Sequence, residues 1–402
     1  MDATIERIRE AISALPSASK YYSYGTAGFR DKYTPSMHVV FVKVGILAAL
    51  RSLNVNGQAI GVMITASHNA KEDNGVKIVD PDGGMLTQSW ENTAEKLVNA
   101  DIDGFIHGLI EFIAEKKIQS LSAPPLVIIG ADCRDHSPIL SEFVKKGVEI
   151  VLNGICHHIG RSTTPLLHYV VAGVNQDTSF SVSTPFDATK YINAYFDDLY
   201  FGFTDLVKSA DKVSSETSAL ILDCAYGVGS VTTEQFLQHI SLRGGLPNWD
   251  IQIRNRVGEG PVNENSGAEH CQKLQIPCHG VSAEQDHHQL LCSFDGDADR
   301  IVFHAFPEAQ ALSWTLLDGD RIASLIAQFL NAELLAAGLV DKIDVGIVQT
   351  AYANGSSTHF LKNNGIQIHI TKTGVKYLHH KAHELDIGIY FEANGHGTVL
   401  FS

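Results

Sequence analysis

The sequence is poor in the residues that define disulfide-rich and zinc-bound proteins. Its 402 residues include only 6 cysteines, 4 methionines and 3 tryptophans, and no two cysteines form a Cys-x-x-Cys pair. Scattered cysteines favour free thiols in a reducing compartment over a disulfide framework or a zinc site. We therefore expect a cytoplasmic protein.

Long apolar runs and a signal peptide are also missing. The apolar run from Val44 to Leu50 is far shorter than the roughly 20 residues that a helix needs to cross a bilayer. The N-terminal residues are charged and contain no apolar signal-peptide core. We expect no membrane partner.

Positive charge is scarce relative to negative charge. The chain has 30 Lys and Arg against 45 Asp and Glu, a formal net charge of −15. This balance argues against general binding to nucleic acid, whose phosphates attract basic surfaces. We expect no nucleic-acid partner, and an anionic small molecule would need a local cationic pocket.

The apolar segments that are present predict an α/β protein. Short runs rich in Val and Ile alternate with longer segments of helical period, which is typical of βαβ units and of mixed or parallel sheets. The clearest predicted strands are Ile60 to Thr65, Leu126 to Gly130, Leu220 to Asp223, Leu290 to Phe294, Val345 to Gln349 and Ile387 to Phe391. The chain divides into three blocks, 1–178, 179–302 and 303–402, and each has one strand-loop element dense in polar residues.

Two segments have a clear helical pattern. One begins at Asp318, a suitable N-cap, and predicts a buried stripe that shares the spacing i, i+3, i+4, i+7, i+8: Ile322, Leu325, Ile326, Phe329 and Leu330. The other is the aromatic-rich tract from Asp187 to Val213, which predicts a helix and connector at a domain junction.

The stretch from Leu291 to Arg300 carries the most informative pattern. Asp295, Asp297 and Asp299 follow a predicted buried strand at alternate positions. Carboxylates this close repel one another unless a hard divalent cation neutralises them. An EF-hand loop is excluded because Arg300 and Phe306 stand where it needs Gly and Glu. A phosphatase with Asp295 as nucleophile and Asp297 as acid remains an alternative.

Ser67 lies directly after another predicted buried strand, in Thr65-Ala-Ser-His-Asn. Such a serine is either a turn cap or a nucleophile held at a rigid strand end. A triad hydrolase is poorly supported, since Ser67 lacks the Gly-x-Ser-x-Gly elbow.

Further polar stretches could recognise a phosphorylated sugar. Residues Glu392 to Gly397 crowd donors and acceptors between glycines, which suits sugar hydroxyls and an amide, with a satisfied turn as the alternative. Just upstream, residues 371–376 supply two lysines and a glycine. Arg30 and Arg134 could bind phosphate, although a single Arg is more often an ion-pair partner. The Gly-x-Gly in residues 223–230 lacks a third glycine and predicts a strand-to-helix turn.

Taken together, these stretches resemble the loops of the α-D-phosphohexomutase superfamily. Thr65-Ala-Ser-His-Asn resembles its phosphoserine loop, Asp295-Gly-Asp-Ala-Asp-Arg300 its magnesium loop, and Glu392-Ala-Asn-Gly-His396 its sugar loop, in the order of that family. The resemblance implies three consecutive mixed-sheet α/β domains of the phosphohexomutase type, 1–178, 179–302 and 303–402, with the family's fourth domain absent from this chain.

The resemblance also implies a chemistry. Phosphorylated Ser67 would convert N-acetylglucosamine 6-phosphate to N-acetylglucosamine 1-phosphate through a 1,6-bisphosphate, for UDP-N-acetylglucosamine biosynthesis. One Mg²⁺ per chain would be held by Ser67, Asp295, Asp297 and Asp299, and the partner would be a small-molecule amino-sugar phosphate. Alternatives are a non-catalytic sugar-phosphate binder and a different hexose specificity.

The remaining roles follow from the same resemblance. Proton transfer and phosphate stabilisation would fall to His68, Arg30 and Lys376, with the assignment among them open. The implied substrate-binding residues are Glu392, Ala393, Asn394, His396, Thr373 and Gly374.

Three departures from the family pattern carry expectations of their own. Ala70 stands where the family has Pro, which would loosen the Ser67 loop, and Ala131 replaces an Arg of the Gly-Arg-Asp-x-Arg stretch. The sequence ends at Ser402 without the family's Arg-Pro-Ser-Gly-Thr type phosphate loop. We therefore expect weak or absent turnover from these 402 residues alone.

Overall fold

The computed structural model describes residues 2–25, 28–118, 123–209, 218–246 and 249–402. Contacts divide the chain into two compact units. The first unit comprises Met1–Ser214 and Val231–Pro247, and the second comprises Ser215–Ser230 and Asn248–Ser402. The units are described separately below.

The first unit is built on a five-stranded mixed sheet with the order β1-β3-β2-β4-β5. Its strands are β1 (Phe29–Lys32), β2 (Ile60–Ile64), β3 (Asp73–Val79), β4 (Leu126–Ala131) and β5 (Ile155–Arg161). Strands β2, β4 and β5 run parallel, whereas β3 runs antiparallel to both β1 and β2. The two strands predicted in this region, β2 and β4, are therefore confirmed within one residue at their ends.

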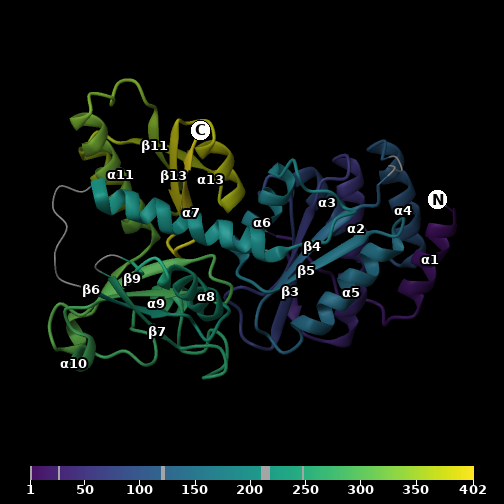
Figure 1. Cartoon of the computed structure of the whole chain (residues 1–402), viewed down its shortest axis with the longest axis horizontal. Helices are drawn as coiled ribbons and strands as arrows, with labels where there is room; N and C mark the ends of the chain where they lie inside the picture. Colours follow the sequence, from purple (N-terminus) through teal and green to yellow (C-terminus); the bar gives the residue numbers. More distant parts are fainter. Residues whose placement is uncertain (1, 26–27, 119–122, 210–217, 247–248) are drawn as a thin grey trace. The chain divides into compact units, whose positions relative to one another are not determined.

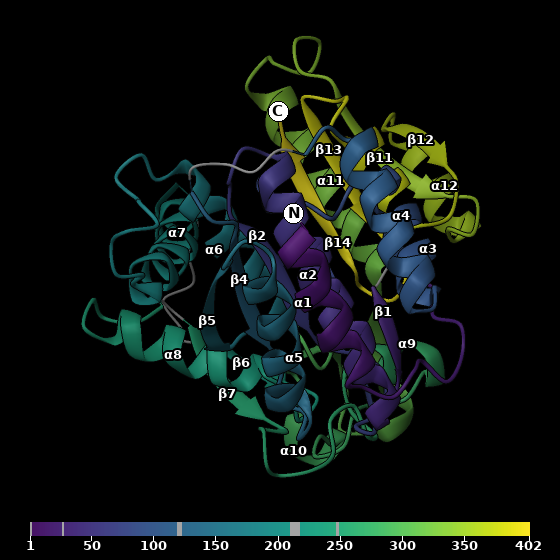
Figure 2. The ribbon, with the colours of Figure 1, turned by 90° about the vertical axis from the view of Figure 1, so that its right-hand side faces the viewer.

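Helices cover both faces of this sheet (Figure 1). They are α1 (Asp2–Ser13), the 3₁₀ turn η1 (Pro35–Met37), α2 (His38–Asn54), α3 (Gln88–Asn99), α4 (Ile102–Glu115), α5 (Ser137–Ile150), α6 (Thr164–Gln176), α7 (Ala188–Ser209) and α8 (Gly229–Ser241), of which residues from Val231 onward belong to this unit. Figure 2 looks onto α1, α2 and α5, which pack together over one face.

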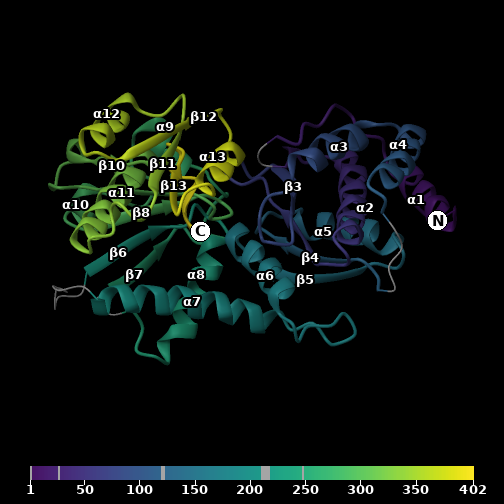
Figure 3. The same cartoon turned by 90° about the horizontal axis from the view of Figure 1, so that it is seen from above.

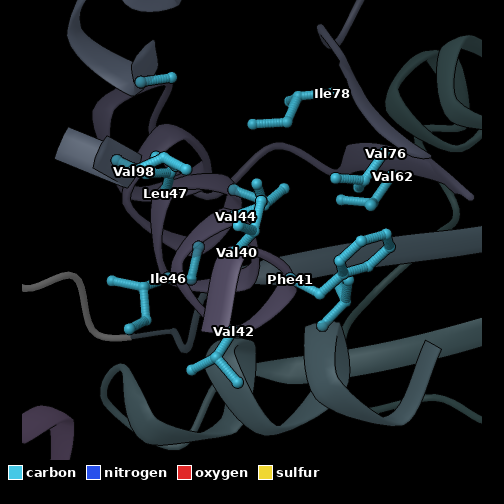
Figure 4. Close-up of a cluster of buried hydrophobic side chains, with 14 of the residues drawn as sticks. Val40, Phe41, Val42, Val44, Ile46, Leu47, Val62, Val76, Ile78 and Val98 are labelled. Carbon is cyan, nitrogen blue, oxygen red and sulfur yellow. The ribbon is translucent and has the colours of Figure 1, made fainter. Parts of the chain in front are cut away.

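Helix α2 is the centre of the core, because nearly every residue from Val39 to Leu50 is buried. Its side chains meet Val62, Val76 and Ile78 of the sheet (Figure 4). Each Val, Leu or Phe side chain buried in this way contributes about 1.5–3 kcal/mol. Among the described residues, the segment Pro35–Asn54 alone is long and apolar enough to cross a membrane, and most of it is buried inside this unit.

Two glycines allow α2 and α5 to approach closely. A Cβ on Gly45 would lie 2.1 Å from the carbonyl oxygen of Val144, and one on Gly147 would lie 2.1 Å from that of Val42. Only glycine fits at such a contact. On the opposite face of the sheet, α6 and Tyr191 of α7 cover a second cluster. The helix predicted between Asp187 and Val213 is therefore confirmed as α7, and residues 210–213 lie outside the described residues.

The second unit contains two sheets. One is five-stranded with the order β10-β9-β8-β6-β7, and the other is four-stranded with the order β12-β11-β13-β14. The strands are β6 (Ser218–Asp223), β7 (Trp249–Arg254), β8 (Leu290–Phe294), β9 (Ile301–Ala305), β10 (Thr315–Leu317), β11 (Val345–Thr350), β12 (Gln367–Thr371), β13 (Ile387–Phe391) and β14 (Gly397–Phe401). Figure 3 shows β6 beside β7, its parallel partner.

The helices of the second unit connect and cover these strands. They are α9 (Ala268–Leu274), α10 (Ala283–Asp286), the 3₁₀ turn η2 (Ala311–Ser313), α11 (Gly319–Ala336), α12 (Gly355–Asn363) and α13 (Val375–Ala382). All four strands predicted in this part of the sequence are present. The five-stranded sheet continues to Leu317, and the division into three domains at residues 178 and 302 stays a prediction.

Helix α11 confirms the predicted N-cap but not the whole predicted stripe. The Asp318 carboxylate accepts a hydrogen bond from the backbone N–H of Arg321 at 3.1 Å. Leu325 and Phe329, however, are 52% and 57% exposed, so their predicted burial is wrong. The buried face is centred instead on Ala323 and Ala327, because small side chains let the helix approach the sheet closely.

Candidate active site

Ser67 lies in a constrained turn at the end of β2. It is buried, with 4% of its surface exposed, and its φ is +51°. Its backbone N–H donates to Thr65 Oγ1 at 2.9 Å, and the N–H of Asn69 donates to the carbonyl of Ala66 at 3.0 Å. A left-handed non-glycine residue costs roughly 1–3 kcal/mol and persists where surrounding contacts hold it, most often at functional sites. The turn-cap and nucleophile interpretations of Ser67 both stay predictions.

The side chain of Arg134 holds this turn through hydrogen bonds to its backbone. It is fully buried in an ion pair with Asp132, and its Nη2 donates to the carbonyl oxygens of Ser67 at 3.1 Å and Asn69 at 2.7 Å. Of the two roles open to Arg134 in the sequence, the structure therefore supports the ion-pair partner.

Arg30 and His68 lie close to the same turn. Arg30, on β1, is exposed, and its Nη1 donates to Asn69 Oδ1 at 3.4 Å. Asn69 Nδ2 donates to Asp73 Oδ2 at 2.8 Å, so this amide links the turn to β3. His68 is half-buried beside Ser67. Residues 26–27, which shortly precede Arg30 in the sequence, lie outside the described residues.

The three aspartates after β8 converge as predicted. Oxygens of Asp295, Asp297 and Asp299 lie within 4.8 Å of one another, and the first two side chains are fully buried. The backbone N–H groups of Asp299 and Arg300 both point at Asp295 Oδ1, at 3.1 and 3.3 Å. Three carboxylates on one curled loop are the donor set that hard cations such as Mg²⁺ prefer.

Charged side chains from neighbouring positions also contact this loop. Arg300 lies 3.9 Å from Asp295 and donates to Glu269 at 2.5 Å, and Lys273 also pairs with Glu269. Arg300 therefore lies between Glu269 and the aspartate loop, whose three carboxylates a divalent ion would bridge.

The loop is braced by a turn that the sequence analysis treated as a weak signal. The segment after β6 is a strand-to-helix turn, as predicted, with Ala225 and Tyr226 both at φ +54°. The N–H of Val228 donates to the carbonyl of Gly296 at 3.1 Å, and a Cβ on Gly227 would lie 2.5 Å from the same oxygen. Gly227 is therefore required for this contact.

The predicted sugar-binding residues form a tight hairpin between β13 and β14. The N–H of Glu392 donates to the carbonyl of His396 at 2.8 Å, and the N–H of His396 donates to Asn394 Oδ1 at 3.0 Å. Ala393 accepts a hydrogen bond from the N–H of Gly319, at the start of α11, at 3.2 Å. The hairpin is thus fixed by the body of the second unit.

This hairpin lies directly against the aspartate loop. The N–H of Ile301 donates to the carbonyl of Gly395 at 3.1 Å, and His396 Nδ1 lies 3.6 Å from Asp299 Oδ1. Gly395 has φ +87°, and a Cβ there would lie 2.1 Å from the Ile301 carbonyl oxygen. Two stretches almost a hundred residues apart in sequence therefore form one polar surface.

Thr373, Gly374 and Lys376 follow β12, with Lys376 in the first turn of α13. Strands β12, β11 and β13 are parallel, so the residues after each of them lie at the same edge of the sheet. The structure thus places Lys376 at the edge that also carries Glu392, two strands away.

A second cluster in the same unit, Cys271, Cys278 and His304, also has side-chain atoms within 4.8 Å of one another. Here the donors are already engaged. Trp314 Nε1 donates to His304 Nδ1 at 3.2 Å, and His304 Nε2 lies 3.1 Å from Ser293 Oγ. Burial lowers the pKa of His304 to about 4, and a bond to Cys271 together with burial raises the pKa of Cys278. Hydrogen bonds to Ser293 and Trp314 therefore already engage this cluster.

Two family profiles match the chain. Residues 318–402, which include the sugar hairpin, match "Phosphoacetylglucosamine mutase AMG1, domain III". Residues 39–104, which include Ser67, match "Phosphoglucomutase/phosphomannomutase, alpha/beta/alpha domain I".

Known proteins are similar to almost the whole chain. It is 44% identical over 380 residues to the phosphoacetylglucosamine mutase of Homo sapiens, covering 94% of this chain and 66% of that protein. It is 40% identical over 386 residues to phosphoacetylglucosamine mutase 1 of Schizosaccharomyces pombe, covering 96% and 71%. The chain therefore spans about two thirds of the length of these relatives.

The fold is equally similar to solved structures. The structure of Aspergillus fumigatus N-acetylphosphoglucosamine mutase in complex with GlcNAc-6P and magnesium superposes with a TM-score of 0.86 at 36% identity, covering 100% of this chain and 71% of that chain. A complex of a variant of the same enzyme with glucose 1,6-bisphosphate gives a TM-score of 0.89 at 35% identity and covers 100% and 72%.

The fold and these loops place the chain in the α-D-phosphohexomutase superfamily, as the sequence resemblance predicted. Within that superfamily, the chain belongs to the phosphoacetylglucosamine mutase family. The superfamily and the fold class are thereby confirmed, whereas the roles of individual site residues stay predictions.

Proposed function

We propose that these residues carry the site of the phosphoacetylglucosamine mutase reaction, which interconverts N-acetylglucosamine 6-phosphate and 1-phosphate for UDP-N-acetylglucosamine biosynthesis. The observation that carries the proposal is the contact between the aspartate loop and the sugar hairpin, through Ile301, Gly395 and the Asp299–His396 pair. A phosphoryl-transfer site needs charge stabilisation beside sugar recognition, and the second unit supplies both on one surface.

Ser67 is the proposed phosphoryl carrier. The phosphoryl group moves from Ser67 Oγ to a free sugar hydroxyl, whose proton passes to a base, while the leaving Ser67 Oγ takes up a proton; the product is the 1,6-bisphosphate. After reorientation, Ser67 Oγ gives up its proton to a base and accepts the other phosphoryl group, and the sugar oxygen that it leaves is protonated. His68, Arg30 and Lys376 are the candidates for proton transfer and phosphate stabilisation.

The donor set of the aspartate loop fits Mg²⁺. Asp295, Asp297, Asp299 and a phosphoserine oxygen on Ser67 would hold the ion, which when bound offsets negative charge on the transferring phosphoryl group. Glu392 and Asn394 are proposed to bind sugar hydroxyls, and Ala393, His396, Thr373 and Gly374 are the further proposed substrate-binding residues.

We also propose that the protein acts in the cytosol on a small amino-sugar phosphate. All six cysteines are free in the structure, which suits a reducing compartment.

Phosphate mapping tests the proposal directly. The 402-residue chain is incubated with Mg²⁺ and glucose 1,6-bisphosphate, and the modified residue is located by mass spectrometry. We expect one phosphate on Ser67, none in Ser67→Ala, and transfer of that phosphate to N-acetylglucosamine 6-phosphate. An acyl phosphate on Asp295 would instead support the phosphatase alternative, and bound sugar phosphate without any phosphorylation would support the non-catalytic binder.

A further inference from the structure

The Ser67 turn is tied to the protein by a buried charge pair that no reacting group can reach. Asp132 and Arg134 follow β4, the parallel neighbour of β2, and both side chains are fully buried. The N–H of Asp132 donates to the carbonyl of Ile64 at 2.9 Å, which joins the ends of the two strands. Because the Arg134 side chain has no exposed surface, it acts on a substrate only through the backbone that it holds.

The guanidinium geometry explains why this position suits arginine. Nη1 bonds the Asp132 carboxylate, while Nη2 reaches two carbonyl oxygens, those of Ser67 and Asn69. A planar fork can make these bonds in fixed directions, whereas a lysine ammonium on a flexible stem cannot span all three acceptors in the same way. The two carbonyls flank His68, so the fork fixes the turn on both sides of the residue after the serine.

Asp132 is itself held by several donors. Its Oδ1 accepts from Ser137 Oγ at 2.6 Å and from the N–H of Arg134 at 3.0 Å. Ser137 Oγ in turn lies 2.9 Å from Nδ2 of Asn74, a fully buried residue of β3. We call the Asp132–Arg134 pair that holds the Ser67 turn the clamp. The clamp is therefore anchored on β3, β4 and the first turn of α5.

The charge of the clamp matters for a phosphoryl carrier. Ser67 must exist as a neutral alcohol and as a phosphate dianion in one cycle, so a bare cation beneath it would favour the phosphorylated form. Asp132 neutralises Arg134, so the pair holds the turn without attracting the phosphate strongly. Arg30, in contrast, is exposed, and its Nη1 donates to Asn69 Oδ1 at 3.4 Å, so a phosphate on Ser67 can reach this arginine.

We infer that Arg134, neutralised by Asp132, is a positioning residue that holds the Ser67 turn in the same geometry with and without its phosphate. This inference rests on the proposed role of Ser67 as phosphoryl carrier. It assigns to the Asp132–Arg134 pair a part in transfer rate rather than in sugar binding.

The same unit offers a matched control. Arg51 forms a second mostly buried pair with Asp80, through Nε at 2.8 Å and Nη2 at 3.0 Å. Its side chain makes none of the hydrogen bonds described above for the Ser67 turn. Arg51→Lys therefore weakens a comparable ion pair without touching the clamp.

The test compares Arg134→Lys with Arg51→Lys in the full chain. We expect Arg134→Lys to accept phosphate from glucose 1,6-bisphosphate and pass it to N-acetylglucosamine 6-phosphate about 10- to 100-fold more slowly, because small misplacements of a reacting group have effects of this size. The sugar concentration giving half the maximal rate should stay unchanged. The ³¹P resonance of phosphorylated Ser67 should broaden or split, and Arg51→Lys should show neither change.

A second variant tests the charge argument separately. Asp132→Asn keeps an acceptor for Ser137 but leaves Arg134 without its neutralising charge, so phosphorylated Ser67 should persist longer while its formation is not slowed. If Arg134→Lys behaves like Arg51→Lys, or if Asp132→Asn slows formation and release equally, the inference is overturned. If wild-type Ser67 takes up no phosphate at all, it is the proposed function that fails.

Discussion

The Ser67 loop and the aspartate loop have similar backbone settings but differ in the charged groups that lie beside them. Both follow a buried parallel strand and both include a residue at positive φ, Ser67 in one and Ala298 in the other. Beneath Ser67 the charges are paired within the protein, since Asp132 neutralises Arg134. In the aspartate loop, three carboxylates, those of Asp295, Asp297 and Asp299, converge within 4.8 Å of one another.

One loop is held by hydrogen bonds from a buried ion pair, whereas the other presents a group of carboxylates that a cation could bind. Hydrogen bonds from Arg134 hold the Ser67 turn in place before any substrate arrives. Like charges on the second loop repel one another until a cation binds. We therefore expect the first unit, while Ser67 is unphosphorylated, to respond less to metal ions than the second unit, which should be sensitive to metal and to acid.

The largest predicted effect concerns acid and His304 in the second unit. Burial lowers its pKa from 6.5 to about 4, so the folded state binds fewer protons than the unfolded state between these values. The stability that it contributes is complete above pH 6.5 and is lost as the pH falls to about 4. The full effect is about 3.5 kcal/mol at roughly 1.4 kcal/mol per pKa unit.

Hydrogen exchange on peptides of β8 and β9, measured at pH 7 and pH 5, follows this loss locally. The pH dependence should largely vanish in His304→Gln and persist in His359→Gln, which changes an exposed histidine of the same unit. An unchanged profile in His304→Gln would assign the acid sensitivity to other groups.

The next effect is stabilisation of the second unit by Mg²⁺. Binding at about 100 times the dissociation constant adds about 2.7 kcal/mol to the free energy of unfolding. Thermal melts with increasing Mg²⁺ should show this gain in the wild type and lose it in Asp297→Asn. The control Asp318→Asn removes another carboxylate of the same unit but keeps an N-cap, so it should respond to Mg²⁺ as the wild type does.

A substitution at Gly227 should show whether the turn after β6 supports the aspartate loop, separately from the carboxylates that would bind the metal. In Gly227→Ala the new Cβ would lie 2.5 Å from the Gly296 carbonyl oxygen, so the aspartate loop must shift. Overpacking of this kind costs about 1–3 kcal/mol, and Mg²⁺ affinity should fall although every carboxylate remains. Gly355→Ala is the matched control because open space surrounds that position. Equal Mg²⁺ affinity in both variants, measured by calorimetry, would show that the turn after β6 does not brace the loop.

The smallest effect is expected on the outer face of α11. Phe329 is 57% exposed, so Phe329→Ser should change the free energy of unfolding by no more than about 0.5 kcal/mol. Ile326→Ser, which alters a side chain packed on the core, should destabilise the unit more. Urea denaturation of the two variants checks the order, and a larger loss from Phe329→Ser would mean that this face is covered in solution.

Sequence patterns predicted the strands well because buried parallel strands need continuous apolar runs. Leu290–Phe294 and Ile387–Phe391 end where they were expected to end. The error on α11 has a physical cause as well. A helical stripe of large apolar residues does not reveal that alanines can form the face that approaches a sheet most closely, as Ala323 and Ala327 do.

The roles of polar residues were predicted less completely. The crowding of Asp295, Asp297 and Asp299 was readable because neighbours in sequence on a loop must be neighbours in space. The bracing role of Gly227 was not, because it depends on contact with Gly296, some seventy residues away. For Arg134, the sequence offered two roles, and burial beside Asp132 distinguishes between them.

By itself, the sequence determined the α/β class, the superfamily and the loops that carry polar chemistry, since these depend on local periodicity and short motifs. Only the tertiary structure decided which loops meet. It placed the sugar hairpin against the aspartate loop through Gly395 and Ile301, and it buried Arg134 beneath Ser67. Contacts of this kind depend on how distant strands are ordered within a sheet and on which side chains are left no access to water, and neither is encoded in any single stretch of sequence.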